Sequence, residues 1–368
     1  ERKSIGEICD ICRGRVMSKD YISENKGEYP VYSSQTENNG ELGRIATYDF
    51  DGEYLSWTTD GANAGTVFYR NGKFSVTNVC GLLKVKNDGL LTKYLYYTLN
   101  TEAPNHVNSG MGNPKLMSNV MAKITIPIPP LPVQEEIVRI LDAFTELTAE
   151  LTAELTARKK QYEHYTYQLL NFDDTVNTLE LRDLIDFRNG KGHEKDIVGD
   201  GKYIVVNSKF ISTDGEVKKY SNKQICPLYI DDILMVMSDL PNGRALAKCY
   251  LVTEDDKYTL NQRIGAFHVK DESVIITKFL LYVLNRNHQL LRYDNGVDQT
   301  NLRKDDILDI MIPVPSIEEQ ERIVAILDRF DTLCNDISAG LPAEIEARQR
   351  QYEYYRDKLL TFKELIAN

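Results

Sequence analysis

The sequence lacks several features that would place the protein in common classes. No run of 18 apolar residues is present, so no membrane-spanning helix is expected. The first residues, ERKSIGEICDICRGR, contain no apolar stretch of a secretory signal. Six cysteines scattered over 368 residues do not form a disulfide framework, and they favour a reducing, cytoplasmic location. Basic residues are also few, since 44 Lys and Arg against 55 Asp and Glu give a net charge of −11. By itself this charge argues against a nucleic-acid partner.

Motifs for catalysis and metal binding are missing as well. The sequence contains no GxxxxGK[ST] phosphate loop, no HExxH and no glycine-rich cofactor loop that opens a βαβ unit. Cys9 and Cys12 form one CxxC, but zinc needs four ligands and no second pair follows. Two small apolar side chains in a first strand are the simpler interpretation. No catalytic residue and no metal site is therefore predicted on this chain.

The most informative feature that is present is an internal repeat. Residues 126–144 (IPIPPLPVQEEIVRILDAF) and 312–330 (IPVPSIEEQERIVAILDRF) agree at eleven of nineteen positions without a gap. A second pair, residues 157–172 and 347–362, agrees at nine of sixteen positions. The offsets of 186 and 190 residues are too long for a solenoid and predict two duplicated domains.

The repeat divides the chain into four segments. Two large segments, about 1–126 and 173–312, alternate with two repeated segments, 127–172 and 313–368. The repeated segments are proportionately the most acidic, with net charges of −3 and −4, and are poor candidates for phosphate contact. The first large segment is neutral, with 14 basic and 14 acidic residues, and has room for a local basic face.

Both repeated segments are expected to form long helices. Prolines precede each one, acidic residues follow, and apolar residues recur at helical spacing. No Gly or Pro interrupts residues 133–172, which predicts a helix of about 40 residues, roughly 60 Å long. Its middle, TELTAELTAELTA at 145–157, repeats a four-residue unit, whereas Gly340 and Pro342 predict a break in the second copy. A narrow apolar stripe must be buried against another helix, and the duplicate is the expected mate.

The large segments are expected to be rich in β-strands. Residues 66–85 contain β-branched and aromatic residues around a tight turn at 71–73, which predicts a hairpin. Further strands are expected within 202–212 and 229–238. Each large segment also contains a helical stretch, TKYLYYTLN in the first and TKFLLYVLN in the second, at an offset of 185. The large segments are therefore diverged duplicates too, and the predicted fold class is α+β with a pseudo-two-fold duplication.

Together these features resemble the specificity (S) subunits of type I restriction–modification systems, over the whole chain. The resemblance is carried by the IP-x-PP-L-x-x-Q-E-x-IV segment at 126–138 and its copy at 312–324, by the tails ARKKQYEHY and ARQRQYEYY, and by the TAEL repeats. It implies two α/β target recognition domains separated by two long antiparallel coiled-coil helices. Each domain would read one half of a bipartite double-stranded DNA target, with an unread spacer between the halves.

The resemblance also implies partners. Two methyltransferase (M) subunits would dock on the helices, and restriction (R) subunits would join through them, for adenine methylation and ATP-dependent cleavage. S-adenosylmethionine, ATP and Mg²⁺ are then expected on the partner subunits, with no cofactor on this chain. The NPK at 113–115 is not the NPP-aromatic motif of amino-methyltransferases, which fits a non-catalytic specificity subunit.

DNA contact calls for Arg, Lys, Asn and Gln at base edges and for Ser and Thr at phosphates. Three polar loops in each large segment offer these types, at 32–40, 58–65 and 109–115 in the first segment and at 206–212, 238–244 and 295–304 in the second. In the first segment the candidates are Ser34, Gln35, Asn38, Thr59, Asn63, Arg70, Lys73, Asn113 and Lys115. In the second they are Asn207, Lys209, Asn242, Arg244, Gln299, Thr300, Asn301 and Arg303. Arg70 and Lys73 flank the predicted hairpin tip, where phosphate contact and a merely solvated turn are both open.

Two other functions remain open from the sequence alone. A protein-interaction scaffold would use the paired domains to bind protein and would have no sequence-dependent affinity for DNA. An enzyme with an unrecognised site in a β-rich segment would have one deep pocket lined by titratable groups.

Overall fold

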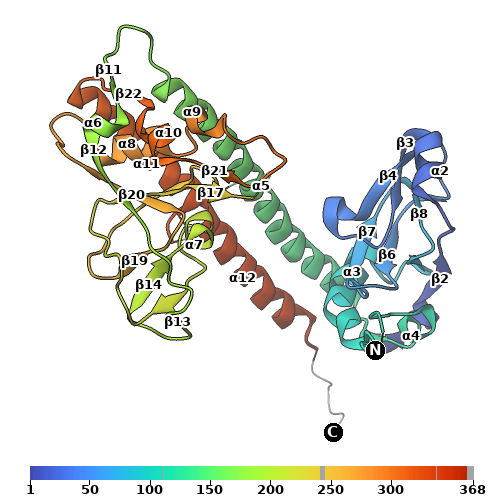
Figure 1. The fold of residues 1–368 in the computed structure, drawn as a ribbon. Helices are drawn as coiled ribbons and strands as arrows, with labels where there is room; N and C mark the ends of the chain where they lie inside the picture. The colour runs from blue at the N-terminus through green and yellow to red at the C-terminus, as the bar shows by residue number, and fades with distance from the viewer. Residues whose placement is uncertain (111, 241–244, 337, 363–368) are drawn as a thin grey trace. The chain divides into compact units, whose positions relative to one another are not determined.

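The computed structural model describes residues 1–110, 112–240, 245–336 and 338–362 (Figure 1). Asn242 and Arg244, two of the predicted contact residues, lie outside the described residues. The chain forms two compact units: residues 1–154 with the segment from Leu341 onward, and residues 155–340. Each unit combines a mixed α/β domain with segments of long helix, so the predicted α+β fold with an internal duplication is confirmed.

The first domain contains two four-stranded sheets. One is antiparallel, in the order β2 (Cys9–Arg13), β9 (Cys80–Val85), β6 (Tyr54–Thr58) and β7 (Val67–Arg70). The other is mixed, in the order β4 (Glu41–Ile45), β3 (Lys26–Tyr32), β8 (Lys73–Val76) and β5 (Phe50–Asp51). In the mixed sheet β3 and β8 run parallel. A short pair, β1 (Arg2–Ser4) with β10 (Thr125–Pro127), joins the two ends of the domain.

Short helices complete the first domain. They are α1 (Ile5–Ile8), α2 (Lys19–Glu24), η1 (Glu37–Gly40), α3 (Thr92–Glu102), η2 (Ala103–His106) and α4 (Ser118–Met121). The core centres on Trp57, which is fully buried and donates from Nε1 to the Leu116 carbonyl at 2.9 Å. Gly81 on the neighbouring strand leaves room for this ring, because a Cβ there would lie 2.1 Å from it. The predicted helix over residues 92–100 is α3.

The second domain has the same antiparallel sheet order and the same parallel pair in its mixed sheet, whereas the other strands of the mixed sheet differ. Its antiparallel sheet has the order β12 (Ile185–Asn189), β20 (Ile264–Val269), β16 (Ile233–Val236) and β18 (Cys249–Leu251). Its mixed sheet has the order β13 (Ile197–Val198), β15 (Tyr220–Ser221), β14 (Tyr203–Val206) and β19 (Tyr258–Leu260), with β14 and β19 parallel. Two short pairs are β11 (Thr178–Glu180) with β22 (Met311–Pro313) and β17 (Ser238–Asp239) with β21 (Thr300–Asn301). Its helices are α6 (Leu181–Leu184), α7 (Ser208–Ser212), α8 (Thr277–Leu284), α9 (His288–Leu291) and α10 (Lys304–Leu308).

Two local predictions are wrong. The turn at 71–73 does not close a hairpin, because β7 pairs with β6 while β8 pairs with β3 and β5 in the other sheet. The turn therefore carries the chain from one sheet to the next. The stretch 202–212 is a strand only as far as Val206, because the Asn207 side chain accepts a hydrogen bond from Phe210 N at 2.9 Å and starts α7.

The long helices follow the predictions closely. Helix α5 (Leu131–Leu170) has 40 residues, and it starts two residues early with Pro132 in its first turn, where proline is tolerated. The second copy is broken as expected, since α11 (Ile317–Asn335) ends before Gly340 and α12 (Leu341–Leu360) begins after it. Helix α5 belongs to both compact units, because the boundary between them falls after Glu154. The two units therefore have different bounds from the four segments that the repeat defines.

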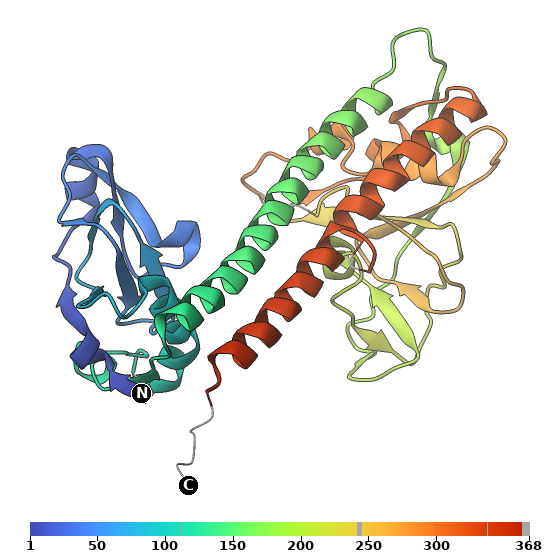
Figure 2. The same cartoon turned by 180° about the vertical axis from the view of Figure 1, so that it is seen from behind.

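Figure 2 shows the long helices α5 and α12 as green and red ribbons. Aromatic pairs join the long helices within each unit. In the first unit Phe144 of α5 stacks on Tyr355 of α12 with ring centroids 5.4 Å apart. In the second unit Tyr165 of α5 packs against Phe330 of α11, also at 5.4 Å. Phe144 and Phe330 are repeat equivalents, as are Tyr355 and Tyr165. The first part of one helix thus meets the last part of its mate in both units, which is an antiparallel arrangement.

A buried glutamine fastens the start of each long helix to its domain. Gln134 is 0 % exposed, accepts from Leu91 N at 2.9 Å, and donates to the carbonyls of Gly89 and Pro129 at 3.0 and 2.9 Å. Gln320, also 0 % exposed, makes the same three bonds: it accepts from Ile276 N at 2.8 Å and donates to the carbonyls of Val274 and Pro315 at 3.0 and 2.9 Å. These bonds explain why the Gln is identical in both copies of the repeat.

A carboxylate two turns further on makes a second attachment. Asp142 binds Lys93 at 2.5 Å and accepts from the Tyr97 hydroxyl at 2.6 Å. In the second unit Asp328 binds Lys278 and Tyr282, each at 2.7 Å. Burial, and then the hydrogen bond to the carboxylate, raises the pKa of both tyrosines, so each hydroxyl remains a donor. The orientation of each domain on its helix is therefore set by two polar attachments.

Candidate nucleic-acid interface

The predicted polar loops of the first domain meet at one edge. Thr77 N donates to the Tyr32 carbonyl at 2.9 Å, and Thr59 N donates to that of Val79 at 3.1 Å. Leu116 N donates to the Thr59 carbonyl at 3.0 Å. We call the segments 32–40, 58–65, 77–79, 108–110 and 112–116 the first loop edge.

The second domain forms the same edge through equivalent backbone bonds. Asn261 N donates to the Val206 carbonyl at 3.1 Å, and Leu302 N donates to that of Met237 at 2.8 Å. Met237 N in turn donates to the Arg263 carbonyl at 2.9 Å. We call the segments 190–194, 206–212, 237–240, 261–263 and 299–303 the second loop edge. Each of the six polar loops predicted from the sequence contributes residues to these two edges, within the part of the chain that the structure describes.

The predicted contact residues differ in how far they reach solvent. Those exposed at the two edges are Asn38, Asn63, Asn113, Lys115, Lys209, Gln299, Asn301 and Arg303. Those half-buried are Ser34, Gln35 and Asn207. Those buried are Thr59, Arg70 and Thr300. Lys73 is exposed but lies at the opposite end of β8 from the first loop edge, with Nζ 4.8 Å from the Tyr48 ring centroid.

Arg70 is not on an exposed tip, so that part of the prediction is wrong. Its side chain is 2 % exposed, its Nε donates to Ser56 Oγ at 3.0 Å, and its guanidinium lies 3.6 Å from the Tyr32 ring centroid. Burial lowers the pKa of Arg70 to about 10. Its two terminal nitrogens have no hydrogen-bond partner within the described residues. A Cβ on Gly40 would lie 3.1 Å from Nη2, so Arg70 supports loop 32–40 from beneath.

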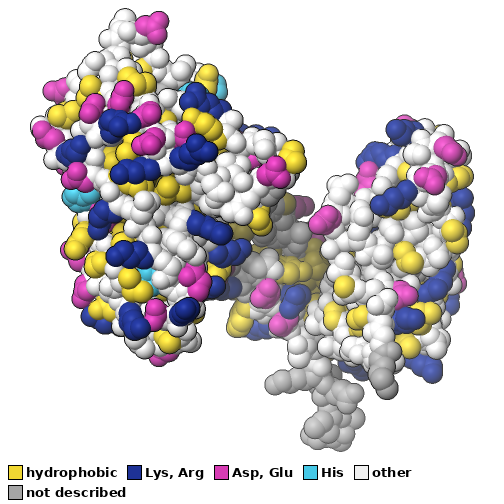
Figure 3. All heavy atoms as spheres, viewed as in Figure 1, with side chains coloured by type: hydrophobic (Ala, Val, Ile, Leu, Met, Phe, Trp, Pro, Cys, Tyr) yellow, Lys and Arg dark blue, Asp and Glu magenta, His cyan; other side chains and the backbone are white. Residues whose placement is uncertain are grey.

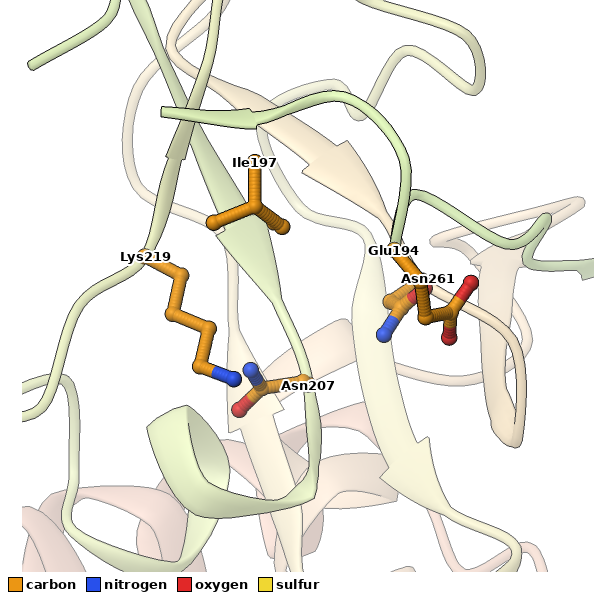
Figure 4. Close-up of a pocket in the computed structure, with 5 residues that line it drawn as sticks. All are labelled: Glu194, Ile197, Asn207, Lys219 and Asn261. Carbon is orange, nitrogen blue, oxygen red and sulfur yellow. The ribbon is translucent and has the colours of Figure 1, made fainter. Parts of the chain in front are cut away.

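A polar pocket of about 300 Å³ opens at the second loop edge, lined by Glu194, Ile197, Asn207, Lys219 and Asn261 (Figure 4). Asn207 follows β14 directly and Asn261 follows β19, so the pocket lies at the carboxyl ends of the two parallel strands. This is where ligands commonly bind in open sheets with parallel strands.

The family model described as the type I restriction modification DNA specificity domain matches residues 1–158 and again 173–347. The chain belongs to this family. DNA recognition is the family's role, and the protein is a type I specificity subunit.

Several known proteins are similar to this type I specificity subunit over nearly its whole length. The specificity subunit S.MpnORF507P of Mycoplasma pneumoniae is 35% identical, over 98% of this chain and 97% of that protein. The S subunit of a type I restriction–modification system from M. genitalium has the same fold, with a TM-score of 0.61 at 15% identity over 99% of this chain and 96% of that one. A structure from a study of complex assembly in a type I system aligns with a TM-score of 0.60 at 13% identity, over 98% and 97%.

Sequence reasoning missed the central segments of both loop edges in this specificity subunit. Asn78 and the pair Gln262 and Arg263 lie between the predicted loops and are exposed. Arg15 forms an isolated β-bridge with Thr77, and Lys191 forms one with Asn261, next to the same segments. The sequence does contain a signal for these segments. After β8 and β19 the two copies align, as FSVTNVCGLL and YTLNQRIGAF, and both have polar residues at the turn.

The specificity subunit has no cluster of three or more His, Cys, Asp or Glu side chains suited to a metal ion in the part of the chain that the structure describes. Among the helices of the same described part, none is long and apolar enough to cross a membrane.

The CxxC of the specificity subunit does not form one centre. Cys9 and Cys12 lie three residues apart on strand β2, so their side chains point to opposite faces. Cys9 faces the core, where burial raises its pKa to about 12, while Cys12 is exposed. At pH 8 a thiol with that pKa has on the order of 1,000-fold less thiolate than an ordinary cysteine.

We therefore expect the two thiols to differ sharply in alkylation at pH 8. Cys12 should be modified in the native protein, whereas Cys9 should react only on unfolding, and Cys12→Ser should remove the faster of these two reactions. Tandem mass spectrometry of the peptide that contains both residues measures each rate. A Cys9–Cys12 disulfide, or equal rates, would contradict the assignment.

Proposed function

We propose that this specificity subunit reads a bipartite double-stranded DNA target, one half-site with each loop edge, across an unread gap. The supporting observation is that the two domains build the same edge through equivalent backbone hydrogen bonds but present different side chains on it. One scaffold with two side-chain sets is suited to two different short sequences. Dimeric DNA-binding proteins follow the same geometry with two chains.

The contact residues we propose are those that the edges present to solvent. In the first domain they are Ser34, Gln35, Asn38, Asn63, Asn113 and Lys115, and in the second Asn207, Lys209, Gln299, Asn301 and Arg303. Most are amides, which suit base edges, and the few cations suit phosphate or guanine.

The net charge predicts that the subunit binds DNA tightly only together with partner subunits. The chain has a net charge of −11, and on the face in Figure 3 basic side chains are interspersed with acidic ones rather than gathered in one field. Because phosphate neutralisation supplies most non-specific affinity, the isolated chain should bind DNA weakly. We propose that two M subunits dock on the long helices and share the phosphate contacts, and that R subunits join them.

Chemistry is then assigned to the partners. S-adenosylmethionine, ATP and Mg²⁺ belong on the M and R subunits in this proposal, and the complex acts in the cytoplasm as an adenine methyltransferase and an ATP-dependent restriction enzyme. The purified specificity subunit alone should transfer no methyl group to DNA. Methyl transfer by the single chain would overturn this assignment.

The direct test is methylome sequencing. The chain is expressed with the methyltransferase encoded beside it in a host free of DNA methylation, and modified bases are mapped by single-molecule reads. We expect a bipartite motif with a fixed gap that disappears when this chain is omitted. If the two proteins co-purify and the methyltransferase binds S-adenosylmethionine but no motif is found, the subunit is instead a protein-interaction scaffold.

A further inference from the structure

The pocket at the second loop edge holds side chains whose donors and acceptors are fixed. Asn207 Oδ1 accepts from Phe210 N at 2.9 Å, and Asn261 Oδ1 accepts from His193 N at 3.2 Å. Since each carbonyl oxygen must face its N–H donor, the orientation of both amides is settled. The two NH₂ groups have no other partner in the described part of the chain, so they remain free to donate.

The acceptor in the pocket is held in the same way. Glu194 Oε1 accepts from Gln262 Nε2 at 2.6 Å, which leaves Oε2 available. The neighbouring His193 is 0 % exposed and anchors this segment, with Nδ1 2.7 Å from the Lys191 carbonyl and Nε2 2.9 Å from Thr259 Oγ1. Asn207, Asn261 and Glu194 are therefore positioned before a ligand arrives, which reduces the entropy that binding must overcome.

The first domain has different chemistry at the same backbone positions. Thr77 N bonds to Tyr32 O as Asn261 N bonds to Val206 O, so Ser33 corresponds to Asn207 and Thr77 to Asn261. In the first domain the two side chains bond to each other, with Thr77 Oγ1 donating to Ser33 Oγ at 3.1 Å. A duplicated position with hydroxyls in one copy and amides in the other is suited to discriminating between two half-sites.

We propose that this pocket is a base-reading subsite that takes the major-groove edge of a G·C pair in the half-site of the second domain. This inference rests on the proposed DNA-reading function. Figure 4 places the Lys219 ammonium beside the Asn207 amide on one side of the pocket, with Glu194 and Asn261 on the other. Two adjacent donors match the adjacent O6 and N7 acceptors of guanine, and a carboxylate accepts from the N4 amino group of cytosine. Adenine would turn its N6 amino group against the two donors.

Three substitutions test this assignment without removing the anchoring bonds, and the first two are isosteric. Asn207→Asp keeps the oxygen that caps α7 but replaces the amide donor with an acceptor. Glu194→Gln keeps an oxygen for Gln262 and replaces the free acceptor with a donor. Lys219→Gln removes the ammonium, and Lys218→Gln is its matched control, since Lys218 is exposed next to it and does not line the pocket.

The measurement is methylome sequencing of each variant with its methyltransferase, followed by binding of the purified complex to duplexes with each base pair of the motif replaced in turn. Asn207→Asp, Glu194→Gln and Lys219→Gln should lower discrimination at the same G·C pair by roughly 5- to 100-fold, and leave the other half-site and the gap unchanged. Lys218→Gln should leave the motif as it is.

The possible outcomes separate this inference from the proposed function. If the wild-type complex has no motif, the proposed function fails. If the wild-type motif is present but these variants leave it unchanged, or alter only an A·T pair, the base-reading subsite is wrong and the pocket serves another ligand or none. Should Asn207→Asp fail to fold, Glu194→Gln and Lys219→Gln decide the question, because both side chains are exposed.

Discussion

Deletion of residues 148–151 from helix α5 is expected to shorten the unread gap of the DNA target by one to two base pairs, while both half-sites stay the same. The deleted residues are one TAEL unit of the helix. Four helical residues span about 6 Å, and B-DNA rises about 3.4 Å per base pair. The remaining helix is also rotated by roughly 40° relative to its start, so activity on the new target should be lower than on the old one.

The position of this deletion makes the expectation specific. The Phe144–Tyr355 pair precedes the deleted unit and the Tyr165–Phe330 pair follows it, so the deletion removes none of the residues that join the long helices through these pairs. Neither loop edge includes these residues. Methylome sequencing of the deletion variant and the wild type gives the gap directly.

A suitable control changes the helix without changing its length. Thr148 and Thr152 donate side-chain hydrogen bonds to the carbonyls of Phe144 and Thr148, at 2.8 and 2.7 Å. The double variant Thr148→Ala, Thr152→Ala should keep the wild-type gap. A deletion that changes the half-site sequences, or that leaves the gap as it was, would show that α5 does not set the spacing.

Gln134→Ala should lower the free energy of unfolding of the first unit by about 3–5 kcal/mol. The substitution strands one buried N–H and two carbonyls, each of which costs on the order of 1–3 kcal/mol when unpaired, with some relief if water enters. In a unit of this size that corresponds to a fall in melting temperature of roughly 10 °C. Gln320→Ala should have the same effect on the second unit.

The paired variants provide their own comparison. Limited proteolysis should release fragments of the first domain from Gln134→Ala and of the second domain from Gln320→Ala. Glu135→Ala, one residue further along and exposed, should melt within about 1 °C of the wild type. Wild-type melting of both glutamine variants would mean that the helix starts are held by apolar packing alone.

The repeat predicted the fold well because its identical residues make the same structural contacts in both copies. Gln134 and Gln320 recur since each satisfies three backbone groups, and Asp142 and Asp328 recur since each binds a lysine and a tyrosine. Helical spacing likewise predicted α5 almost to the residue and the break near Gly340. These features depend on short-range patterns that a sequence displays directly.

The errors have a different origin, in long-range pairing. The residues around 71–73 have the local signature of a hairpin, yet the strands on either side join different sheets. Arg70 was expected at an exposed tip for the same reason, but its burial depends on Tyr32 and Ser56 from distant strands. The polar pocket was equally hidden, because Glu194, Asn207 and Asn261 meet only once β14 and β19 pair in parallel.

The discontinuous make-up of the first unit has a consequence for how the protein is synthesised. Residues 155–340 form a continuous unit, which has all its parts as soon as it leaves the ribosome. The first unit emerges earlier but lacks Tyr352, Leu359, Leu360 and Phe362, which pack against its hydrophobic core, until α12 and the residues just after it are translated. Nascent domains usually mature in the order in which they are made. Here the half that is translated first is completed last, so a ribosome that stops before α12 leaves an apolar surface on the opposite end of the chain.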